Sequence, residues 1–429
     1  MQESSKQEAK RIGIGMVAGL VLGLILYFTG TGYVFDYIKP VGDIFISLLK
    51  MVIIPLVFSS IFMSMYHLGT PESLGSMGTR AVAYYFATTA IAVFWGIIFV
   101  NLINPGFGAD LGTAGLSGLD ATKQGMVAAN SSGFSALFKA VKDVVMGAVP
   151  SNPVNAMAEG NILQVIVFSI LFGMVALYLP KDSEPVVKVI GSIEKMSLFL
   201  THGIMKFAPI GIFVLMSGVL AVSGFTAIQS LAKYMITVIL GLLFHGGFLL
   251  LIASWRSKKS PMFVLRAIGP AIITAFSTAS SAATLPITMA NVEENMGVRK
   301  DTAKFVLPLG ATINMDGTAL YESVAAIFIA QAYGIHLGIN QQLIIFLTAS
   351  LAAIGAAAIP GAGLITMSIV LSAVGLPIEG IGLILAVDRV LDMFRTAVNV
   401  FGDSVGTIVV DSMLSSEDIK EETEVELTT

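Results

Sequence analysis

The feature that most constrains this chain is a series of apolar runs, each long enough to cross a lipid bilayer. A bilayer core is about 30 Å thick and takes roughly 20 helical residues to cross. Only 12% of the residues are charged, where soluble proteins have about a quarter. The sequence therefore predicts an all-α membrane protein that crosses the bilayer repeatedly. The apolar runs fall near residues 12–32, 42–66, 79–103, 128–179, 196–222, 229–255, 303–333 and 376–412.

Basic residues predict how the chain is oriented. Lys6, Lys10 and Arg11 precede the first run, Arg80 follows the second, and further lysines and arginines follow the fourth and sixth. Short loops rich in lysine and arginine stay on the cytoplasmic side. We therefore expect both termini in the cytoplasm. The absence of cysteine excludes disulfides, thiolate metal sites and cysteine nucleophiles.

Two segments break the simple alternation of spans. Residues 268–290 have basic residues on both flanks and a polar, small-residue middle, which predicts a re-entrant hairpin that enters and leaves by the cytoplasmic face. Residues 343–374 are interrupted by a stretch rich in Gly, Ala and Pro and predict a second hairpin. Non-helical backbone at membrane depth is tolerated where it is buried in protein or lines a cavity. The two segments indicate an internal repeat around a midplane site, and the alternative is a pair of proline-kinked spans.

The last apolar run carries a polar stripe. At about 100° per residue, six polar residues share one arc of the helix, and Arg389 extends it slightly. A charged residue at the bilayer centre costs roughly 2.5–3.5 kcal/mol, so such residues face a cavity or each other. One hypothesis is salt bridges that only fasten helices. The other is a site for a zwitterion with an additional carboxylate, which also explains the neutral polar members. The six residues are Asp388, Asp392, Arg395, Thr396, Asn399 and Asp403.

Residues 310–318 predict an unwound point inside another span. Asn314, Asp316 and Gly317 are poor helix residues between two helix-like segments. Unwinding here would direct carbonyls and the Asp316 carboxylate inward, and hard oxygen ligands suit a small cation such as sodium. The alternative is a loop outside the membrane.

Four motifs of the chain resemble the signature motifs of the glutamate transporter family, the dicarboxylate/amino acid:cation symporters, in the family's order. Residues 84–89 and 152–164 also match, and the resemblance covers essentially the whole chain. It implies eight transmembrane helices plus two re-entrant hairpins arranged as inverted repeats, in a homotrimer within the lipid of the cell (inner) membrane. The four motifs are SSAATLP (280–286), NMDGT (314–318), IPGAG (359–363) and DMFRTAVNVFGD (392–403).

The resemblance further implies a scaffold and a transport domain that moves across the membrane as an elevator. The scaffold would comprise residues 1–78 and 104–228, and the transport domain residues 79–103 and 229–413, followed by an acidic cytoplasmic tail at 414–429.

The resemblance implies the following site residues. Substrate would be bound by Ser280, Ser281, Thr318, Ile359, Gly363, Asp392, Arg395, Thr396 and Asn399. A first sodium ion would be bound by Gly310, Asn314, Asn399 and Asp403, and a second by Tyr85, Thr88, Thr89, Asn314 and Asp316. A third would use backbone oxygens at Thr312, Ala353, Ile354 and Ala356.

The chain also departs from the family's pattern. Archaeal members have an arginine where this chain has Ala279, and Arg389 is the candidate for supplying that charge. Ala282 replaces the third serine that the family often has at the first hairpin tip, which weakens any role for that hydroxyl. Glu322 stands where archaeal members have a glutamine, and it is the candidate for coupling a proton and potassium, or alternatively a carboxylate hydrogen-bonded for packing.

The predicted function is uptake of L-glutamate or L-aspartate coupled to sodium ions, with no organic cofactor. The alternative within the family is a C4-dicarboxylate carrier, whose substrate lacks an ammonium group and has no use for Asp392. A neutral amino acid would leave Arg395 as a buried unpaired charge. A pure ion channel could use the same acidic residues but would not accumulate solute.

An intramembrane hydrolase is disfavoured, so the chain is not expected to be an enzyme. Ser280 and Ser281 lie in no Gly-x-Ser-x-Gly elbow and have no histidine near in sequence. The histidines lie far apart in the sequence and lack metal-ligand spacing, so the sequence predicts no metal site at them: His67, His202, His245 and His336.

Overall fold

The chain folds into helices throughout the part that the structure describes. The computed structural model describes residues 2–68, 71–109, 142, 144–353 and 362–414. In this part no strand occurs, so the predicted all-α class is confirmed. The N-terminal half contains α1 (Gln2–Thr29), η1 (Gly32–Val34), α2 (Phe35–Leu68), α3 (Pro71–Ile103), α6 (Pro153–Glu159), α7 (Ile162–Tyr178), α8 (Pro180–Met205) and α9 (Ala208–Ser257).

The C-terminal half consists of shorter helices followed by one long helix. Within the described ranges, four helical segments are long and apolar enough to cross a membrane: Gly32–His67, Ser76–Ile103, Gly224–Ser257 and Pro261–Thr278. The elements of this half are α10 (Pro261–Thr278), α11 (Ser281–Ala290), the π-helix η4 (Asn291–Met296), α12 (Lys300–Ile313), α13 (Asp316–Ala332), α14 (Ile339–Ala352), α15 (Ala362–Ala373), η6 (Ile378–Gly380) and α16 (Ile381–Met413).

The predicted breaks fall close to where the sequence places them. Helix α10 ends at Ala279, whose φ of 49° is left-handed, and α11 starts at Ser281 and packs back on α10. Helices α12 and α13 are separated at Asn314 and Met315. The second predicted hairpin corresponds to α14 and α15, which pack together, and most of its predicted interruption at 355–363 lies outside the described residues.

The predicted separation between the apolar runs at 196–222 and 229–255 is present, but the first run is itself divided between two helices. The end of α8 takes residues 196–205, and α9 starts at Ala208 because Pro209 suits the first turn of a helix. Helix α9 then bends sharply at Gly224, whose φ is 53°. A Cβ at Gly224 would lie 2.6 Å from the Cζ atom of Tyr27, so this bend requires glycine for both its φ and its close approach to α1.

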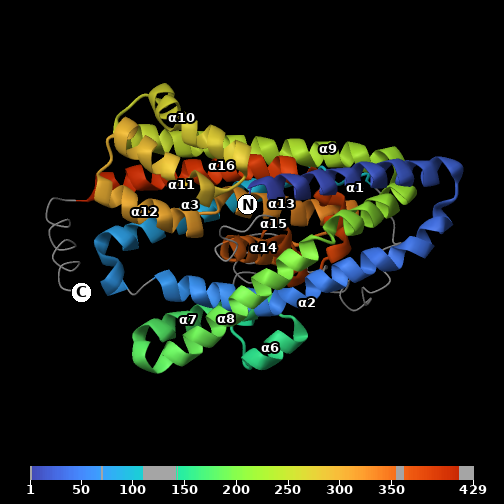
Figure 1. Cartoon of the computed structure of the whole chain (residues 1–429), viewed down its shortest axis with the longest axis horizontal. Coiled ribbons are helices and arrows are strands. Elements are labelled where there is room, and N and C mark those ends of the chain that lie inside the picture. Colours follow the sequence, from blue (N-terminus) through green and yellow to red (C-terminus); the bar gives the residue numbers. More distant parts are fainter. Residues whose placement is uncertain (1, 69–70, 110–141, 143, 354–361, 415–429) are drawn as a thin grey trace.

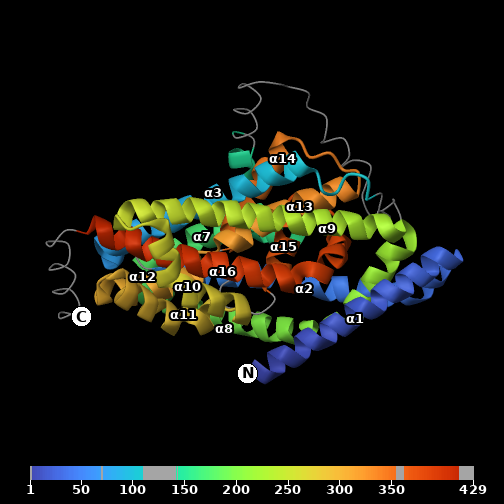
Figure 2. The same ribbon diagram turned by 90° about the horizontal axis from the view of Figure 1, so that it is seen from above.

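Helix α16 lies at the centre of the C-terminal half. It runs along α9 and also packs against α10, α12 and α13 (Figure 1). Helices α2, α7 and α8 form a separate group that packs mainly within itself and lies along the lower side of Figure 1. Seen from above, α14 lies beside α3 and α13 on the side away from α10 and α11 (Figure 2). The break between α12 and α13 is thereby placed against the middle of α16.

Candidate functional site

The site is built around the break between α12 and α13. Asn314 is extended there, with φ −84° and ψ 97°, and Asp316 begins α13. A helix N-terminus favours a carboxylate because its free N–H groups and dipole are positive. The predicted unwinding is therefore present, and it places a carboxylate where the backbone stabilises it.

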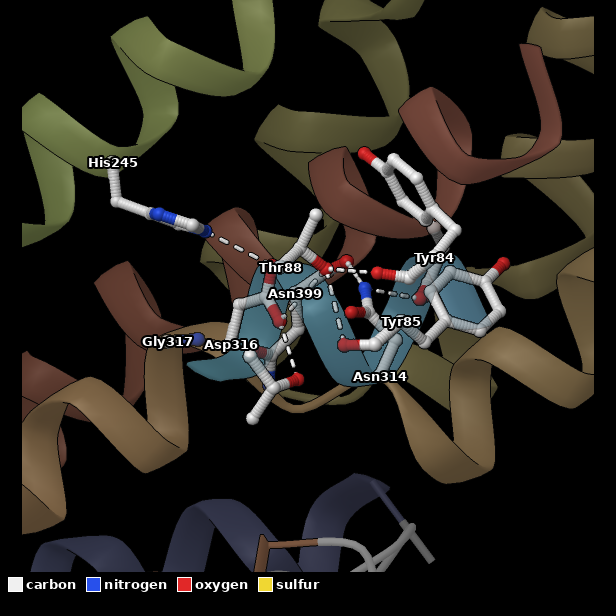
Figure 3. Close-up of polar contacts among 10 residues, drawn as sticks. Tyr84, Tyr85, Thr88, His245, Asn314, Asp316, Gly317 and Asn399 are labelled. Carbon is white, nitrogen blue, oxygen red and sulfur yellow. Dashed lines mark hydrogen bonds and ion pairs between the residues drawn. The ribbon is translucent and has the colours of Figure 1, made fainter. Parts of the chain in front are cut away.

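The carboxylates of Asp316 and Asp403 anchor a buried cluster of oxygen atoms (Figure 3). The Asp316 Oδ1 atom accepts hydrogen bonds from the hydroxyls of Thr89 at 2.7 Å and Thr88 at 3.4 Å. The Asn314 Nδ2 atom donates to the Asp403 Oδ1 atom at 2.9 Å. The structure thus brings together helices α3, α12, α13 and α16 at one point.

The electrostatics of this cluster favour a small cation. The Asn314 Oδ1 atom is buried and has no hydrogen-bond partner in the described part of the chain. No lysine or arginine forms an ion pair with Asp316 or Asp403 among the described residues. No group of three His, Cys, Asp or Glu side chains is arranged as a metal centre there either. Mixed carboxylate, amide and hydroxyl oxygens are the ligands of a hard cation.

Glycines allow the helices to approach closely around this cluster. A Cβ at Gly310 would lie 2.5 Å from the hydroxyl of Tyr85 and 2.8 Å from the Asp403 Oδ1 atom. A Cβ at Gly402 would lie 2.6 Å from the Asn314 Nδ2 atom. The Tyr85 hydroxyl itself donates to the backbone oxygen of Val306 at 3.2 Å. All residues predicted for the first two sodium sites therefore lie in one region.

A second cluster surrounds the buried guanidinium of Arg395, which is only 1% exposed. Its Nη2 atom lies 2.8 Å from the Asp392 Oδ1 atom, and its Nη1 atom lies 3.2 Å from the Asp388 Oδ1 atom. Asp392 also lies 3.6 Å from Arg389, whose side chain is half exposed. The internal ion pairing that the sequence raised as one hypothesis is therefore present, and it fixes the guanidinium within the protein.

Asn399 of α16 lies beside the oxygen cluster and contacts the start of α13. Its Oδ1 atom accepts from the backbone N–H of Gly317 at 2.8 Å, and its Nδ2 atom donates to the Thr318 hydroxyl at 3.3 Å. The Asn314 amide donates to the backbone oxygen of Asn399 at 3.2 Å. Thr396 is buried on the same helix. Asn399 therefore bonds to both sides of the break between α12 and α13.

The two hairpins approach the Arg395 cluster to different degrees. A Cβ at Gly363 would lie 2.7 Å from the Arg395 Nη1 atom, so α15 begins directly beside the guanidinium. The Ser280 hydroxyl accepts from the backbone N–H of Ala283 and caps α11, and Ser281 is buried. Helix α10 reaches α16 through the rings of Phe276 and Phe394, whose centroids are 5.0 Å apart.

The structure does not bring together all the residues predicted for the substrate site and the third sodium site. Ile359, Ile354 and Ala356 lie outside the described residues. Of the third predicted sodium site, Thr312 is exposed and donates to the backbone oxygen of Leu309, and Ala353 is buried on another segment. The third site therefore stays a prediction.

Two buried side chains were missed by sequence reasoning. The Nε2 atom of His245, on α9, lies 2.9 Å from the Oδ2 atom of Asp316. The central carbon of the Arg395 guanidinium lies 3.9 Å from the ring centroid of Tyr321, on α13. A histidine in the apolar run at 229–255 was a signal that could have been used. No spacing rule in the sequence connects it to Asp316, because the two residues are 71 positions apart.

The fold and the two clusters define a class of protein. Helices long enough to span a membrane enclose a desolvated oxygen cluster and, beside it, a guanidinium paired with carboxylates. Charged groups inside membrane helices mark solute and ion pathways. The molecule is thus an integral membrane protein of the transporter class.

Comparison with known proteins gives the family. The profile of the sodium:dicarboxylate symporter family matches residues 9–413. The proton/glutamate-aspartate symporter of Escherichia coli (strain K12) is 36% identical over 409 residues, covering 94% of this chain and 92% of that protein. The proton/sodium-glutamate symport protein of Geobacillus stearothermophilus is 33% identical, with 94% and 93% covered. Human excitatory amino acid transporter 2 is 39% identical, with 94% and 78% covered. The chain belongs to the sodium:dicarboxylate symporter family.

Proposed function

We propose that the protein takes up L-glutamate and L-aspartate, driven by sodium ions that move with the substrate. The observation that carries this proposal is the pair of Arg395 and Asp392, one helical turn apart and in contact within the membrane-spanning part of the protein. An acidic amino acid is the substrate that complements both charges. The names of the three relatives above support the same substrate class.

In this proposal each polar group of the substrate has a partner on α16 or beside it. The Arg395 guanidinium, helped by the Thr318 hydroxyl, binds the side-chain carboxylate as a bidentate fork. Asp392 binds the ammonium group, and Asn399 and Thr396 bind the main-chain carboxylate. The hairpin tips, with Ser280, Ser281, Ile359 and Gly363, close over the substrate.

The oxygen cluster around Asp316 and Asp403 is proposed to bind two sodium ions. Its support is the two buried carboxylates, with which no described lysine or arginine forms an ion pair, and the Asn314 Oδ1 atom, which has no hydrogen-bond partner among the described residues. Asn399 gives a physical reason for coupling, because its backbone oxygen accepts from Asn314 and its side-chain amide donates to Thr318, so a sodium ion bound at Asn314 and Asn399 orders the residue that reaches Thr318. Thr312, Ala353, Ile354 and Ala356 are proposed for a third ion.

The domain organisation belongs to the same proposal. Residues 1–78 and 104–228 form a scaffold that trimerises, and residues 79–103 and 229–413 form a transport domain that moves as an elevator in the cell membrane, with both termini in the cytoplasm. The separate packing of α2, α7 and α8 supports this division. The half-exposed Arg389 is proposed to tune the charge around Asp392.

Glu322 is proposed to couple a proton to the cycle. It is fully buried on α13, with the Thr366 side chain as a hydrogen-bonding neighbour. An ionised carboxylate in such a place is costly. Two of the relatives are named as proton symporters, which supports this assignment.

The test is uptake by proteoliposomes of labelled glutamate, aspartate and succinate, with sodium, proton and potassium gradients imposed separately. We expect a sodium gradient to drive accumulation of glutamate and aspartate but not succinate. Arg395→Ala and Asp392→Ala should abolish uptake, while Arg395→Lys, which keeps the charge without the planar fork, should retain a small part of it. Accumulation of succinate in preference to aspartate would show a dicarboxylate carrier instead.

A further inference from the structure

The side chain of His245 points from α9 directly at the proposed sodium site (Figure 3). His245 and Asp316 are both 0% exposed, and the His245 Nε2 atom lies 2.9 Å from the Asp316 Oδ2 atom. The proposed function gives His245 no role. A buried imidazole against a buried carboxylate therefore has to be explained separately.

The two carboxylate oxygens of Asp316 contact different residues. Its Oδ1 atom faces the hydroxyls of Thr88 and Thr89, and its Oδ2 atom faces His245. An ionised carboxylate only accepts hydrogen bonds, so the imidazole nitrogen that contacts it has to be the donor. The Nε2 atom therefore has the hydrogen, and the Nδ1 atom has no hydrogen-bond partner among the described residues.

We infer that His245 is a positioning residue for the sodium site, which holds the Asp316 carboxylate in the orientation that presents its Oδ1 atom to the cation. This inference rests on the proposed function of the oxygen cluster. Because His245 contacts Oδ2 and the threonine hydroxyls contact Oδ1, a cation that replaces the hydroxyl hydrogen bonds at Oδ1 leaves the bond to His245 in place. Partners of this kind orient metal ligands, and their loss typically costs about 10- to 100-fold in metal affinity.

The position of the Nε2 atom determines which substitutions of His245 can preserve the contact with Asp316. The amide nitrogen of glutamine can occupy the position of Nε2, whereas that of asparagine is shorter by one carbon and corresponds to Nδ1, which has no partner here. His245→Gln should therefore preserve the contact with Asp316, and His245→Asn and His245→Leu should lose it. A residue that only fills space would show no such difference between the two amides.

The experiment measures sodium affinity in two ways. Purified wild-type and variant proteins in lipid nanodiscs are titrated with sodium chloride, with choline chloride keeping ionic strength constant, and the rise in Tm gives the affinity without substrate. Uptake of labelled aspartate by proteoliposomes then gives the half-saturating sodium concentration and, at saturating sodium, the KM for aspartate. Thr237→Val is the matched control, because Thr237 is fully buried on α9 and its hydroxyl donates to the backbone oxygen of Lys233 on the same helix.

We expect His245→Asn and His245→Leu to raise the half-saturating sodium concentration at least tenfold, with His245→Gln and Thr237→Val within threefold of wild type. The aspartate KM at saturating sodium should change less than threefold in all of them. Wild-type sodium affinity in His245→Leu, or equal losses in His245→Gln and His245→Asn, would overturn the inference. If His245→Leu does not fold, the comparison of the two amides decides. Failure of wild-type uptake with an intact sodium-dependent Tm rise would instead refute the proposed function alone.

Discussion

The guanidinium of Arg395 lies over the ring of Tyr321, with 3.9 Å between its central carbon and the ring centroid. Both side chains are fully buried, and the carboxylates of Asp388 and Asp392 contact the guanidinium nitrogens. A desolvated cation–π contact is worth about 2 kcal/mol. Arg395 is therefore held by an aromatic face as well as by ion pairs.

Replacing this aromatic face should weaken substrate binding. Tyr321→Leu removes the ring, and we expect the KM for aspartate to rise roughly 10- to 30-fold, because about 2 kcal/mol of support for the guanidinium is lost. Tyr321→Phe keeps the ring and is the matched control, with an expected change below threefold. Aspartate uptake by proteoliposomes at saturating sodium measures both. Equal losses in the two variants would show that the hydroxyl, and not the ring, is what matters.

A single methyl group at the start of α15 should disturb the same guanidinium. In Gly363→Ala the new Cβ would lie 2.7 Å from the Arg395 Nη1 atom, closer than real Cβ contacts allow, so the guanidinium or the helix has to shift. We expect at least a tenfold rise in the aspartate KM. Gly269→Ala in α10 is the control, because no atom lies within 4 Å of the Cβ that it adds. An unchanged KM in Gly363→Ala would mean that α15 does not close over the substrate as proposed.

Glu322→Gln tests proton coupling directly. The amide has nearly the shape of the carboxyl group but cannot release a proton. If Glu322 couples a proton, uptake by the variant should lose its response to an imposed pH gradient, while its response to the sodium gradient remains. The measurement is initial uptake of labelled glutamate at fixed sodium with internal pH varied. A pH response identical to that of wild type would assign Glu322 to packing only.

Much of the fold could be predicted from the sequence because membrane helices are long and strongly apolar. The breaks at Ala279 and at Asn314 were predicted from local composition, and both are present. The break between the runs at 196–222 and 229–255 is present as the bend at Gly224, but the additional break between Met205 and Ala208, inside the first of these runs, was not predicted.

The candidate site was predictable where residues lie on one helix or in one motif. The stripe on α16 follows from helical periodicity, and the grouping of Asn314 with Asp316 follows from their motif. The contacts of His245 and Tyr321 depend instead on how α9 and α13 pack against their neighbours. Single-sequence reasoning assigns buried residues of this kind to packing, because their partners are distant along the chain.

The proposed elevator predicts that one ion pair breaks during transport. Lys50 of α2 lies 3.2 Å from Glu379 of η6, and the two residues belong to the proposed scaffold and transport domain respectively. The pair is partly exposed, so it contributes little stability, about 1 kcal/mol or less. If the two domains slide past each other, these positions have to separate in each cycle.

Because the chain has no cysteine, paired cysteines can be introduced without background. In Lys50→Cys/Glu379→Cys, a flexible bifunctional methanethiosulfonate should abolish aspartate uptake, and dithiothreitol should restore it. The control pair is Arg299→Cys/Asp411→Cys, because this 2.7 Å ion pair lies within the proposed transport domain and the same crosslink should leave uptake unaffected. Full uptake by crosslinked Lys50→Cys/Glu379→Cys would show that α2 and η6 stay together throughout transport, and a sliding transport domain bounded as proposed would then be excluded.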